Sequence, residues 1–330
     1  MKTLRTAVVG AGHFGRFHAD KYASLPGSQF VGIVDPNPAA RNAAAAKHGV
    51  AAFAEAGELI GKVDAVSVVV PTSLHYDVAL ALIEAGIHVL IEKPIADTRD
   101  QADKLIAAAA ARGTVLQVGH LQRFLLDRLG ARDYVGTPLY IECDRIHPFN
   151  PRATDVSVVL DLMIHDIDLI LALVGAPVES VMAVGAPVVT KGEDIANVRL
   201  GFANGCVANI TTSRISLKTE RKMRIFGHES YVSLDLAKRK LVAMRRGKGG
   251  LLLGTLLPAM MPGMPPIERI ERDYPDSDDL KTEIESFLGA CRGDHKPHVT
   301  GEDGRAALDV ALQIEDAIRA HRKRFSNLGF

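Results

Sequence analysis

The first ~120 residues alternate short apolar segments with alanine-rich segments of 10–15 residues, and this alternation constrains the fold more than any other feature of the chain. Strands that alternate with helices of this length form βαβ units, whose sheet is parallel and covered on both faces. We expect strands at 6–10, 30–35, 63–70, 88–91 and 114–119, and helices at about 13–25, 38–48, 76–85 and 98–111.

The pattern changes in the second part of the chain. One long helix is expected at about 160–174, and short strands separated by tight-turn residues follow it at 178–186, 195–202, 206–213, 221–226, 231–236 and 240–244. Strands joined by such short turns pair antiparallel. The sequence therefore predicts an α/β protein with a doubly wound parallel sheet over residues 1–121. An α+β domain with an open antiparallel sheet follows over 122–330, and its last helix spans about 302–322.

The composition excludes several classes of partner. Lysine plus arginine and aspartate plus glutamate both number 39, so the charge balance gives no reason to expect nucleic acid or an anionic membrane as a partner. No segment approaches the roughly 20 apolar residues of a membrane span. Three widely spaced cysteines fit no disulfide framework, which favours a cytoplasmic location. The charge-free segment 249–266 is expected to be an oligomer contact or a mobile lid.

A G-x-G-x-x-G motif at residues 10–15 follows the first expected strand and opens the first helix. It consists of Gly10, Gly12 and Gly15, with His13 and Phe14 between the last two glycines. Asp35 ends the second strand about 20 residues later, as the dinucleotide-binding fingerprint requires. We expect these six residues to bind the cofactor, with the pyrophosphate at the helix N-terminus. The alternative is a glycine-rich turn without a ligand.

Asp35 also bears on the choice between NAD and NADP. A carboxylate accepts hydrogen bonds from the adenosine ribose hydroxyls and repels a 2′-phosphate. The residues that follow, Pro36, Asn37 and Pro38, carry no cation, although Arg41 lies one helical turn further on. The sequence favours NAD.

Glu92, Lys93 and Pro94 follow the fourth strand. Open α/β sheets bind ligands beyond the carboxyl ends of their strands, so Lys93 is expected to project into the cofactor crevice. The alternative is a solvated loop.

The helix near residue 160 carries Asp161, His165 and Asp168, whose spacings of four and three predict one common face. Asp166 is expected on another face. Carboxylates one turn away on each side orient the imidazole and make His165 a candidate proton acceptor. A polar solvent-facing helix is the alternative. A metal site is disfavoured, because no further histidine or cysteine stands in register.

Taken together, these residues resemble the glucose–fructose oxidoreductase/inositol dehydrogenase (Gfo/Idh/MocA) family over nearly the whole chain. The segments that carry the resemblance are GAGHFG at 10–15, Asp35, PTSLHYDVAL at 71–80, EKP at 92–94, DLMIHDIDL at 161–169 and the run 297–304. The resemblance implies a Rossmann domain, an NAD cofactor and oxidation of a sugar hydroxyl.

The resemblance also implies roles for particular residues. Lys93, Asp161 and His165 correspond to the family's catalytic set and are expected to contact the substrate. Pro71, Thr72 and His75 correspond to the loop that lines the nicotinamide half of the cofactor, and Glu92 and Lys93 to contacts of its ribose. The segment 120–124 departs from the family pattern at its first positions. It suggests Gln122 as a cofactor contact and Arg123 as a substrate contact.

Within the family, HADKYASLPG at 18–27 and the run 158–171 resemble enzymes that oxidise C3 of a UDP-N-acetylhexosamine, whose product is aminated for lipid A. Donors for a diphosphate are then expected among Arg123, Arg145, His147 and Arg152. The alternatives are a dehydrogenase of a free sugar or inositol, an enzyme of the family that oxidises only transiently, and a non-catalytic regulator that senses NAD. Relatives also imply a homodimer or homotetramer.

The implied mechanism is a hydride transfer to nicotinamide C4, with neutral His165 taking the hydroxyl proton. Asp161 holds the imidazole, and Lys93 stabilises the developing alkoxide. The sequence leaves open the reverse assignment, in which Lys93 is the base.

Overall fold

The computed structural model describes residues 2–150, 156–246 and 267–326. The chain forms two compact units, and neither is continuous in sequence: Met1–Phe124 with Asp278–Asp309, and Leu125–Ser277 with Val310–Phe330. Helix α9 (Gly301–Ser326) contributes residues to both units. Each unit is built on its own sheet.

The first unit contains a six-stranded parallel sheet in the order β3-β2-β1-β4-β5-β6, which confirms the expected doubly wound α/β fold. The strands are β1 (Leu4–Val9), β2 (Ser28–Val34), β3 (Ala51–Phe53), β4 (Ala65–Val68), β5 (His88–Glu92) and β6 (Leu116–Gly119). The order reverses between β1 and β4. Ligands bind at such a reversal in open α/β sheets, beyond the carboxyl ends of the strands.

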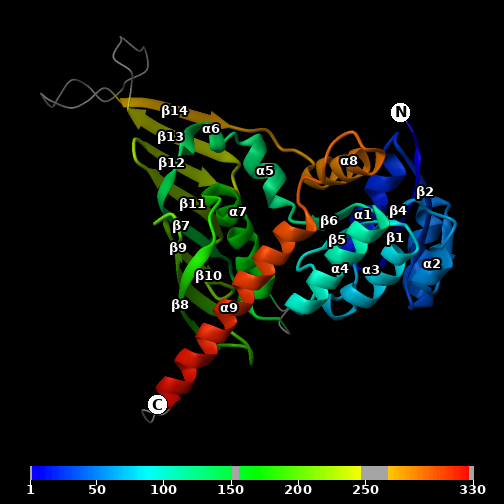
Figure 1. Cartoon of the computed structure of the whole chain (residues 1–330), viewed down its shortest axis with the longest axis horizontal. Helices are drawn as coiled ribbons and strands as arrows, with labels where there is room; N and C mark the ends of the chain where they lie inside the picture. The colour runs from blue at the N-terminus through cyan, green and yellow to red at the C-terminus, as the bar shows by residue number, and fades with distance from the viewer. Residues whose placement is uncertain (1, 151–155, 247–266, 327–330) are drawn as a thin grey trace, which may run out of the picture. The chain divides into compact units, whose positions relative to one another are not determined.

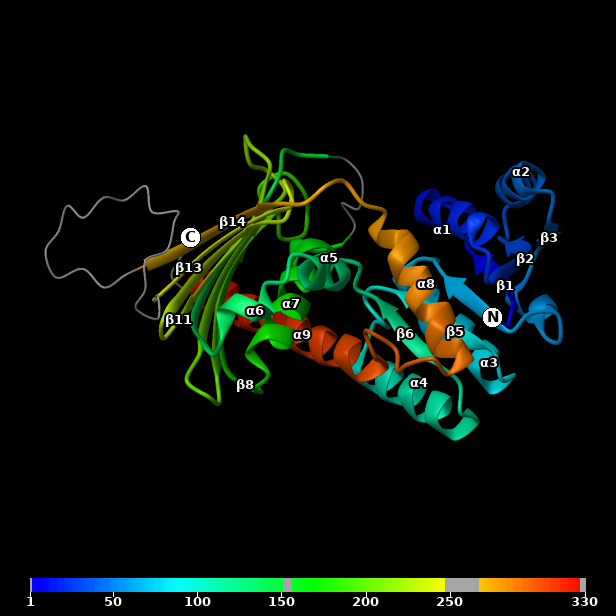
Figure 2. The same cartoon turned by 90° about the horizontal axis from the view of Figure 1, so that it is seen from above.

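Helices cover both faces of this sheet (Figure 1). They are α1 (His13–Ser24), α2 (Pro38–His48), α3 (His75–Glu84) and α4 (Arg99–Arg112), with the short 3₁₀ turns η1 (Ala56–Leu59) and η2 (Thr72–Leu74). Because right-handed crossovers run in opposite directions from β1 and from β4, α1 and α2 pack on one face and α3 and α4 on the other (Figure 2).

Local chemistry sets the ends of these helices. The Asn37 side chain accepts hydrogen bonds from the first-turn N–H groups of Ala39 and Ala40, and Thr98 caps α4 in the same way. Gly49 and Gly113 end α2 and α4 in the left-handed conformation that favours glycine.

The chain returns to the first unit after crossing the second. Helix α8 (Asp279–Arg292) packs against α1, and its Ile284, Phe287 and Leu288 share a core with residues of β1, β2 and α1. Asp278, the residue before α8, pairs with Lys21 at 2.5 Å. This arrangement differs from the expected division at residues 121/122. The apolar face of α8 completes the first core, so residues 278–309 belong with that unit.

The second unit contains an eight-stranded sheet in the order β14-β13-β12-β11-β7-β10-β9-β8. The strands are β7 (Pro138–Ile146), β8 (Val178–Ala186), β9 (Ile195–Phe202), β10 (Val207–Ser213), β11 (Glu220–Gly227), β12 (Ser230–Asp235), β13 (Lys240–Arg246) and β14 (Ile267–Asp273). Neighbouring strands are antiparallel, as expected, except for β7 and β10, which pair in parallel.

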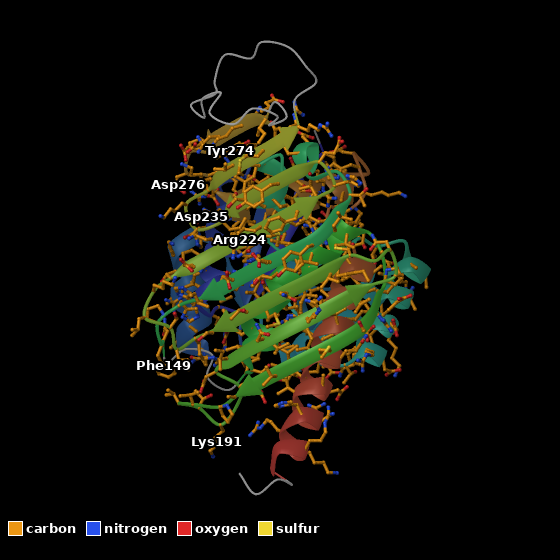
Figure 3. The ribbon with its side chains drawn as sticks, turned by 90° about the vertical axis from the view of Figure 1, so that its left-hand side faces the viewer. Phe149, Lys191, Arg224, Asp235, Tyr274 and Asp276 are labelled. Atoms are coloured by element: carbon orange, nitrogen blue, oxygen red, sulfur yellow. The ribbon has the colours of Figure 1, made fainter. Side chains whose placement is uncertain are left out.

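One face of this sheet carries the helices of the second unit, which include α6 (Arg132–Val135), α7 (Ile164–Val174) and the C-terminal part of α9 (Figure 2). Helix α5 (Gln122–Arg128) begins in the first unit and ends in the second. Along the strands, buried apolar residues alternate with more exposed polar ones. Figure 3 views the opposite face, on which Arg224 lies.

Several elements have no counterpart in the sequence-based expectation: β3, β7, β14, α5, α6 and α8. Charged residues interrupt the apolar residues of β7 and β14, which obscures both strands, and α5 and α6 span only 7 and 4 residues. The last helix is longer than expected. The helix expected at 160–174 begins with a π-helical turn, Val159–Met163, before α7.

In the part of the chain that the structure describes, no helix is long and apolar enough to cross a membrane. The segment 249–266, expected to be an oligomer contact or lid, lies outside the described residues.

A buried carboxylate organises the turn between β8 and β9. Asp194 is fully buried, and its Oδ2 accepts backbone N–H groups of Val188, Val189 and Thr190 at 2.6–2.8 Å. Its Oδ1 accepts the Thr190 hydroxyl at 2.8 Å. Burial raises the pKa of the Asp194 carboxyl, but these donors outweigh burial and bring the pKa to about 2. The ionised carboxylate therefore holds the turn.

We expect Asp194→Asn to lower the free energy of unfolding at pH 7 by about 1–3 kcal/mol, because an amide cannot satisfy four converging donors. A carboxyl with a depressed folded-state pKa stabilises the fold above its ordinary pKa near 4. That stabilisation is lost as pH falls from about 4 towards about 2. The difference between wild type and variant should therefore shrink over this interval in urea denaturation.

The matched control is Asp235→Asn, since Asp235 accepts a single backbone N–H, that of Lys238, at an exposed turn. Its effect should stay within about 0.5 kcal/mol. Equal effects of the two substitutions would contradict the assigned role of Asp194.

Candidate active site

The turn between β1 and α1 leaves no room for side chains at two of its glycines. Gly10 has a φ of +109°, and a Cβ there would lie 2.3 Å from the Val69 carbonyl oxygen. A Cβ at Gly15 would lie 1.9 Å from the Gly10 carbonyl oxygen. Helix α1 can pack against the strand ends only because both residues are glycine.

Gly12 has a different role in the same turn. It is the N-cap of α1, no side chain caps this end of the helix, and a Cβ at Gly12 would meet nothing within 4 Å. No side chain therefore caps the first-turn N–H groups of α1, and the space beside Gly12 is open. This arrangement fits the pyrophosphate of a dinucleotide, which takes N–H donors and the positive end of the helix dipole. The neighbouring rings of His13 and Phe14 contact each other edge to face.

Asp35 stands at the carboxyl end of β2, next to this turn. Its Oδ2 accepts the Ala11 N–H and its Oδ1 accepts the Asn37 N–H, both at 2.8 Å. Each carboxylate oxygen has a second lone pair for a ribose hydroxyl. Arg41 donates to the backbone carbonyls of Asp35 and Pro36. The Arg41 side chain is thus engaged with main-chain oxygens.

A buried chain of hydrogen bonds connects α1 to the end of β5. Tyr22 Oη and Ser67 Oγ lie 2.9 Å apart, Ser67 Oγ and His18 Nδ1 3.0 Å, and His18 Nε2 and Glu92 Oε1 3.1 Å. Glu92 Oε2 accepts the Lys93 backbone N–H at 3.3 Å. Tyr22, Ser67 and His18 are fully buried. The chain therefore orients the Glu92 carboxylate and the main chain that carries Lys93.

The pKa values of Glu92 and of its neighbour Glu283 are shifted in opposite directions. Burial raises the pKa of Glu92, but the hydrogen bond from His18 and the charge of Lys93 outweigh burial and lower it. Burial and the charge of Glu92 raise the pKa of the neighbouring Glu283 carboxyl well above its ordinary value. Both Glu283 carboxyl oxygens are buried without a hydrogen-bond partner among the described residues. The surroundings therefore favour the neutral form of Glu283 and the ionised form of Glu92.

The loop after β4 contains the expected cofactor residues Pro71, Thr72 and His75. Thr72 opens η2, and His75 is buried with Nδ1 2.8 Å from the Pro94 carbonyl and Nε2 2.9 Å from the Val70 carbonyl. Burial lowers the pKa of the His75 imidazole. His75 therefore links the ends of β4 and β5, where the Lys93–Pro94 peptide bond is cis.

Gln122 is the first residue of α5, and the next residue, Arg123, is buried. Arg123 Nη2 lies 3.8 Å from Asp303 Oδ1, so part of its charge is balanced within the first unit.

In the second unit, Asp161 lies in the π-helical turn and His165 in the first turn of α7. The Ile164 N–H bonds to the Val159 carbonyl, five residues back, and widens the helix at this point. Such turns occur frequently at functional sites. Asp161 and His165 are both half-buried, whereas Asp168, expected on the same face, is 1% exposed.

Asp166 is engaged in a buried ion pair. Its carboxylate accepts Arg145 Nε at 2.7 Å and Arg145 Nη2 at 2.6 Å, and the two side chains are 1% and 3% exposed. This bidentate pair fastens α7 to β7 and so fixes the helix that carries His165. Arg145, expected as a diphosphate donor, is thus paired with a carboxylate. His147 lies just beyond β7, and its Nδ1 is 2.7 Å from the Pro148 carbonyl. Arg152 lies outside the described residues.

The described residues contain no group of three or more histidine, cysteine, aspartate and glutamate side chains that could hold a metal ion. Sequence reasoning missed His18, Ser67 and Tyr22. A signal for two of them exists, because Gly15, His18, Ala19 and Tyr22 follow the spacing i, i+3, i+4, i+7 of a buried helix face. An imidazole and a phenol on such a face need polar partners inside the protein.

Comparisons with known proteins agree with this architecture. Residues 4–120 match the family model described as "Oxidoreductase family, NAD-binding Rossmann fold", and residues 126–233 match the GFO/IDH/MocA C-terminal domain. The UDP-N-acetylglucosamine 3-dehydrogenase of Acidithiobacillus ferrooxidans is 40% identical, covering 97% of this chain and 99% of the relative. Its solved structure superposes with a TM-score of 0.88 over the same shares.

A more distant relative, the myo-inositol 2-dehydrogenase of Thermotoga maritima, is 26% identical over 97% of both chains. The structure of the WlbA dehydrogenase from Bordetella pertussis has a TM-score of 0.78 at 20% identity, covering 97% of this chain and 98% of that one, and so shares the fold. The glycine turn, Asp35 and both family matches lead to one conclusion: the chain belongs to the Gfo/Idh/MocA oxidoreductase family and is an NAD-dependent dehydrogenase.

Proposed function

We propose that the protein oxidises the C3 hydroxyl of a UDP-N-acetylhexosamine, with NAD as hydride acceptor. The observation that carries this proposal is the 40% identity, over nearly the full length of both chains, to a UDP-N-acetylglucosamine 3-dehydrogenase. The match spans the segments that contain Lys93, Asp161 and His165. Oxidation of a free sugar or inositol is the second candidate, since the Thermotoga relative also covers 97% of the chain.

The expected site residues have the following proposed roles. The α1 N-terminus takes the pyrophosphate, Asp35 the adenosine ribose, and Glu92 with the loop of Pro71, Thr72 and His75 the nicotinamide half. Bound NAD supplies a carbon that accepts a hydride. Lys93, Arg123, His147, Asp161 and His165 contact the substrate, and Gln122 contacts the cofactor.

His165 is the proposed general base. As the substrate C–H bond loses hydride, the imidazole takes the hydroxyl proton, and the C–O bond becomes a carbonyl. The Asp161 carboxylate orients the ring, and the Lys93 ammonium group stabilises the negative charge that develops on the oxygen. The ion pair of Arg145 and Asp166 supports this assignment, because it holds in place the helix that carries His165.

The proposal extends to cellular context. The 3-keto product is the kind of substrate that an aminotransferase converts to an amino sugar for lipid A. The proposed location of the protein is the cytoplasm. The polar sheet face in Figure 3, which no helix covers in the described part of the chain, supports a homodimer or homotetramer.

A panel of UDP-N-acetylglucosamine, UDP-glucose, N-acetylglucosamine and myo-inositol, each with NAD, tests the proposal by NADH absorbance. We expect steady NADH accumulation and a kcat/KM highest for the UDP-N-acetyl sugar, with the C3 ketone identified by NMR. A preference for inositol would select the second candidate, and no NADH with any sugar would contradict a dehydrogenase role.

We expect His165→Asn to lower kcat about 10²–10⁴-fold, the range of general-base catalysis, and to leave the dissociation constant of NAD unchanged. Steady-state kinetics measure kcat, and fluorescence titration measures the dissociation constant of NAD. His228→Asn, at an exposed histidine of the same unit, is the control and should keep full activity. Parallel loss of NAD binding and turnover in His165→Asn would assign the residue to folding instead.

We expect Asp35→Asn to raise the KM for NAD about tenfold and to narrow the preference for NAD over NADP, because a neutral amide neither binds ribose hydroxyls as strongly nor repels a phosphate. Steady-state kinetics with each cofactor measure this. Asp77→Asn, at an exposed position of α3, serves as control. An unchanged cofactor preference in Asp35→Asn would remove Asp35 from the ribose site.

The buried hydrogen bond from His18 to Glu92 predicts a further result. In His18→Gln an amide N–H can replace Nε2–H, whereas in His18→Leu the Glu92 carboxylate loses its buried donor. We expect His18→Leu to raise the KM for NAD about tenfold or more, the loss of one hydrogen bond to a charged group, and His18→Gln to recover most of it. Equal kinetics of the two variants at equal thermal stability would show that the hydrogen bond does not position Glu92.

A further inference from the structure

Arg221 lies on the helix-covered face of the second sheet. In β11 it alternates with the exposed Lys222 and Arg224 and shares its face with the buried Met223 and Ile225. Arg224, by contrast, lies on the opposite face (Figure 3). In the ladder between β11 and β7, Arg221 is directly opposite Arg145. Two guanidinium groups therefore stand side by side on one face.

Two carboxylates act on this pair: Asp161 on Arg145, and Asp166 on both arginines. Arg145 donates one hydrogen bond to each carboxylate oxygen of Asp166, as described above. Among the described residues, the Arg221 side chain forms no hydrogen bond and no ion pair. The protein around it and the charge of Arg145 lower the pKa of the Arg221 guanidinium, although an arginine remains protonated at neutral pH. The charge of Arg221 therefore has no directly paired carboxylate in the described part of the chain.

This charge lies close to the proposed catalytic helix. Asp166, which attracts Arg221, directly follows His165, and the charge of Asp161 acts on Arg145, the cross-strand neighbour of Arg221. Arg221 is also exposed, so that a ligand can reach it. A guanidinium that is exposed, unpaired and held beside a like charge is suited to an oxyanion, which it binds through two parallel N–H donors.

We propose that Arg221 binds a phosphate oxyanion of the substrate and thereby selects a nucleotide sugar over an uncharged sugar or polyol. This inference rests on the proposed function, which supplies a substrate with a diphosphate. Arg145 contributes by repulsion. The positive charge of Arg145 repels Arg221 and so disfavours an ion pair between Arg221 and Asp166. The hydrogen bonds from Arg145 also engage the Asp166 carboxylate, which reduces its competition with a ligand for Arg221.

The experiment compares wild type, Arg221→Gln, Arg221→Lys and the control Arg224→Gln on the other face of the same strand. Binding of UDP alone is measured by calorimetry, and KM and kcat are measured with UDP-N-acetylglucosamine. We expect Arg221→Gln to weaken UDP binding and raise KM about 10–100-fold, the range for a lost charged hydrogen-bond pair, with a much smaller change in kcat. Arg221→Lys should recover part of the loss, because it keeps the charge but not the two-donor geometry.

The control variant Arg224→Gln should match wild type in all of these measurements. The affinity for NAD should be the same in every variant as in wild type. Wild-type affinity for UDP in a folded Arg221→Gln protein would overturn the inference while leaving the proposed function intact, and so would an equal loss in Arg224→Gln. If wild type binds no UDP and oxidises only uncharged sugars, the proposed function fails and the inference with it.

Discussion

The close contact between α1 and the strand ends is the constraint on which the cofactor half of the protein depends. A methyl group at Gly15 would lie inside van der Waals distance of the Gly10 carbonyl, so α1 can start where it does only with hydrogen at that position. That placement exposes the uncapped N–H groups of the helix and brings His18 and Tyr22 next to Ser67. The uncapped N-terminus of α1 and the buried hydrogen-bond chain therefore both depend on the same requirement for glycine at position 15.

The two carboxyl groups behind the site show how burial and charge divide roles between like residues. Glu92 has a hydrogen-bond donor in His18 and a cation in Lys93, whereas both carboxyl oxygens of Glu283 lack a partner in the described structure. Two ionised carboxylates in such a region would repel strongly. Burial and repulsion therefore favour a neutral Glu283, whereas His18 and Lys93 favour an ionised Glu92.

Much of this arrangement follows from sequence patterns. The apolar segments and the turn residues between them predict the parallel first sheet and most strands of the second. These strands are strongly apolar, and glycine, proline, asparagine or aspartate residues mark their ends. The glycine motif and Asp35 were predicted at the turn where the structure has them. Contacts between residues far apart in sequence were not predicted. Nothing local in β7 indicates its parallel pairing with β10, and nothing near Asp166 indicates that Arg145, on another element, takes both of its oxygens. The π turn before α7 was not predicted either, because the spacing of Asp161, His165 and Asp168 is also that of a regular α-helix.

The return of the chain to the first unit has a consequence for biosynthesis. Ile284, Phe287 and Leu288 fill the core between β1 and α1, yet they are made some 280 residues after Leu4 and Val8. A ribosome-bound chain that has released only its first 124 residues exposes an apolar surface that α8 will later cover. The nucleotide-binding half is thus the first to begin folding, and it must wait for nearly the whole polypeptide before its interior closes.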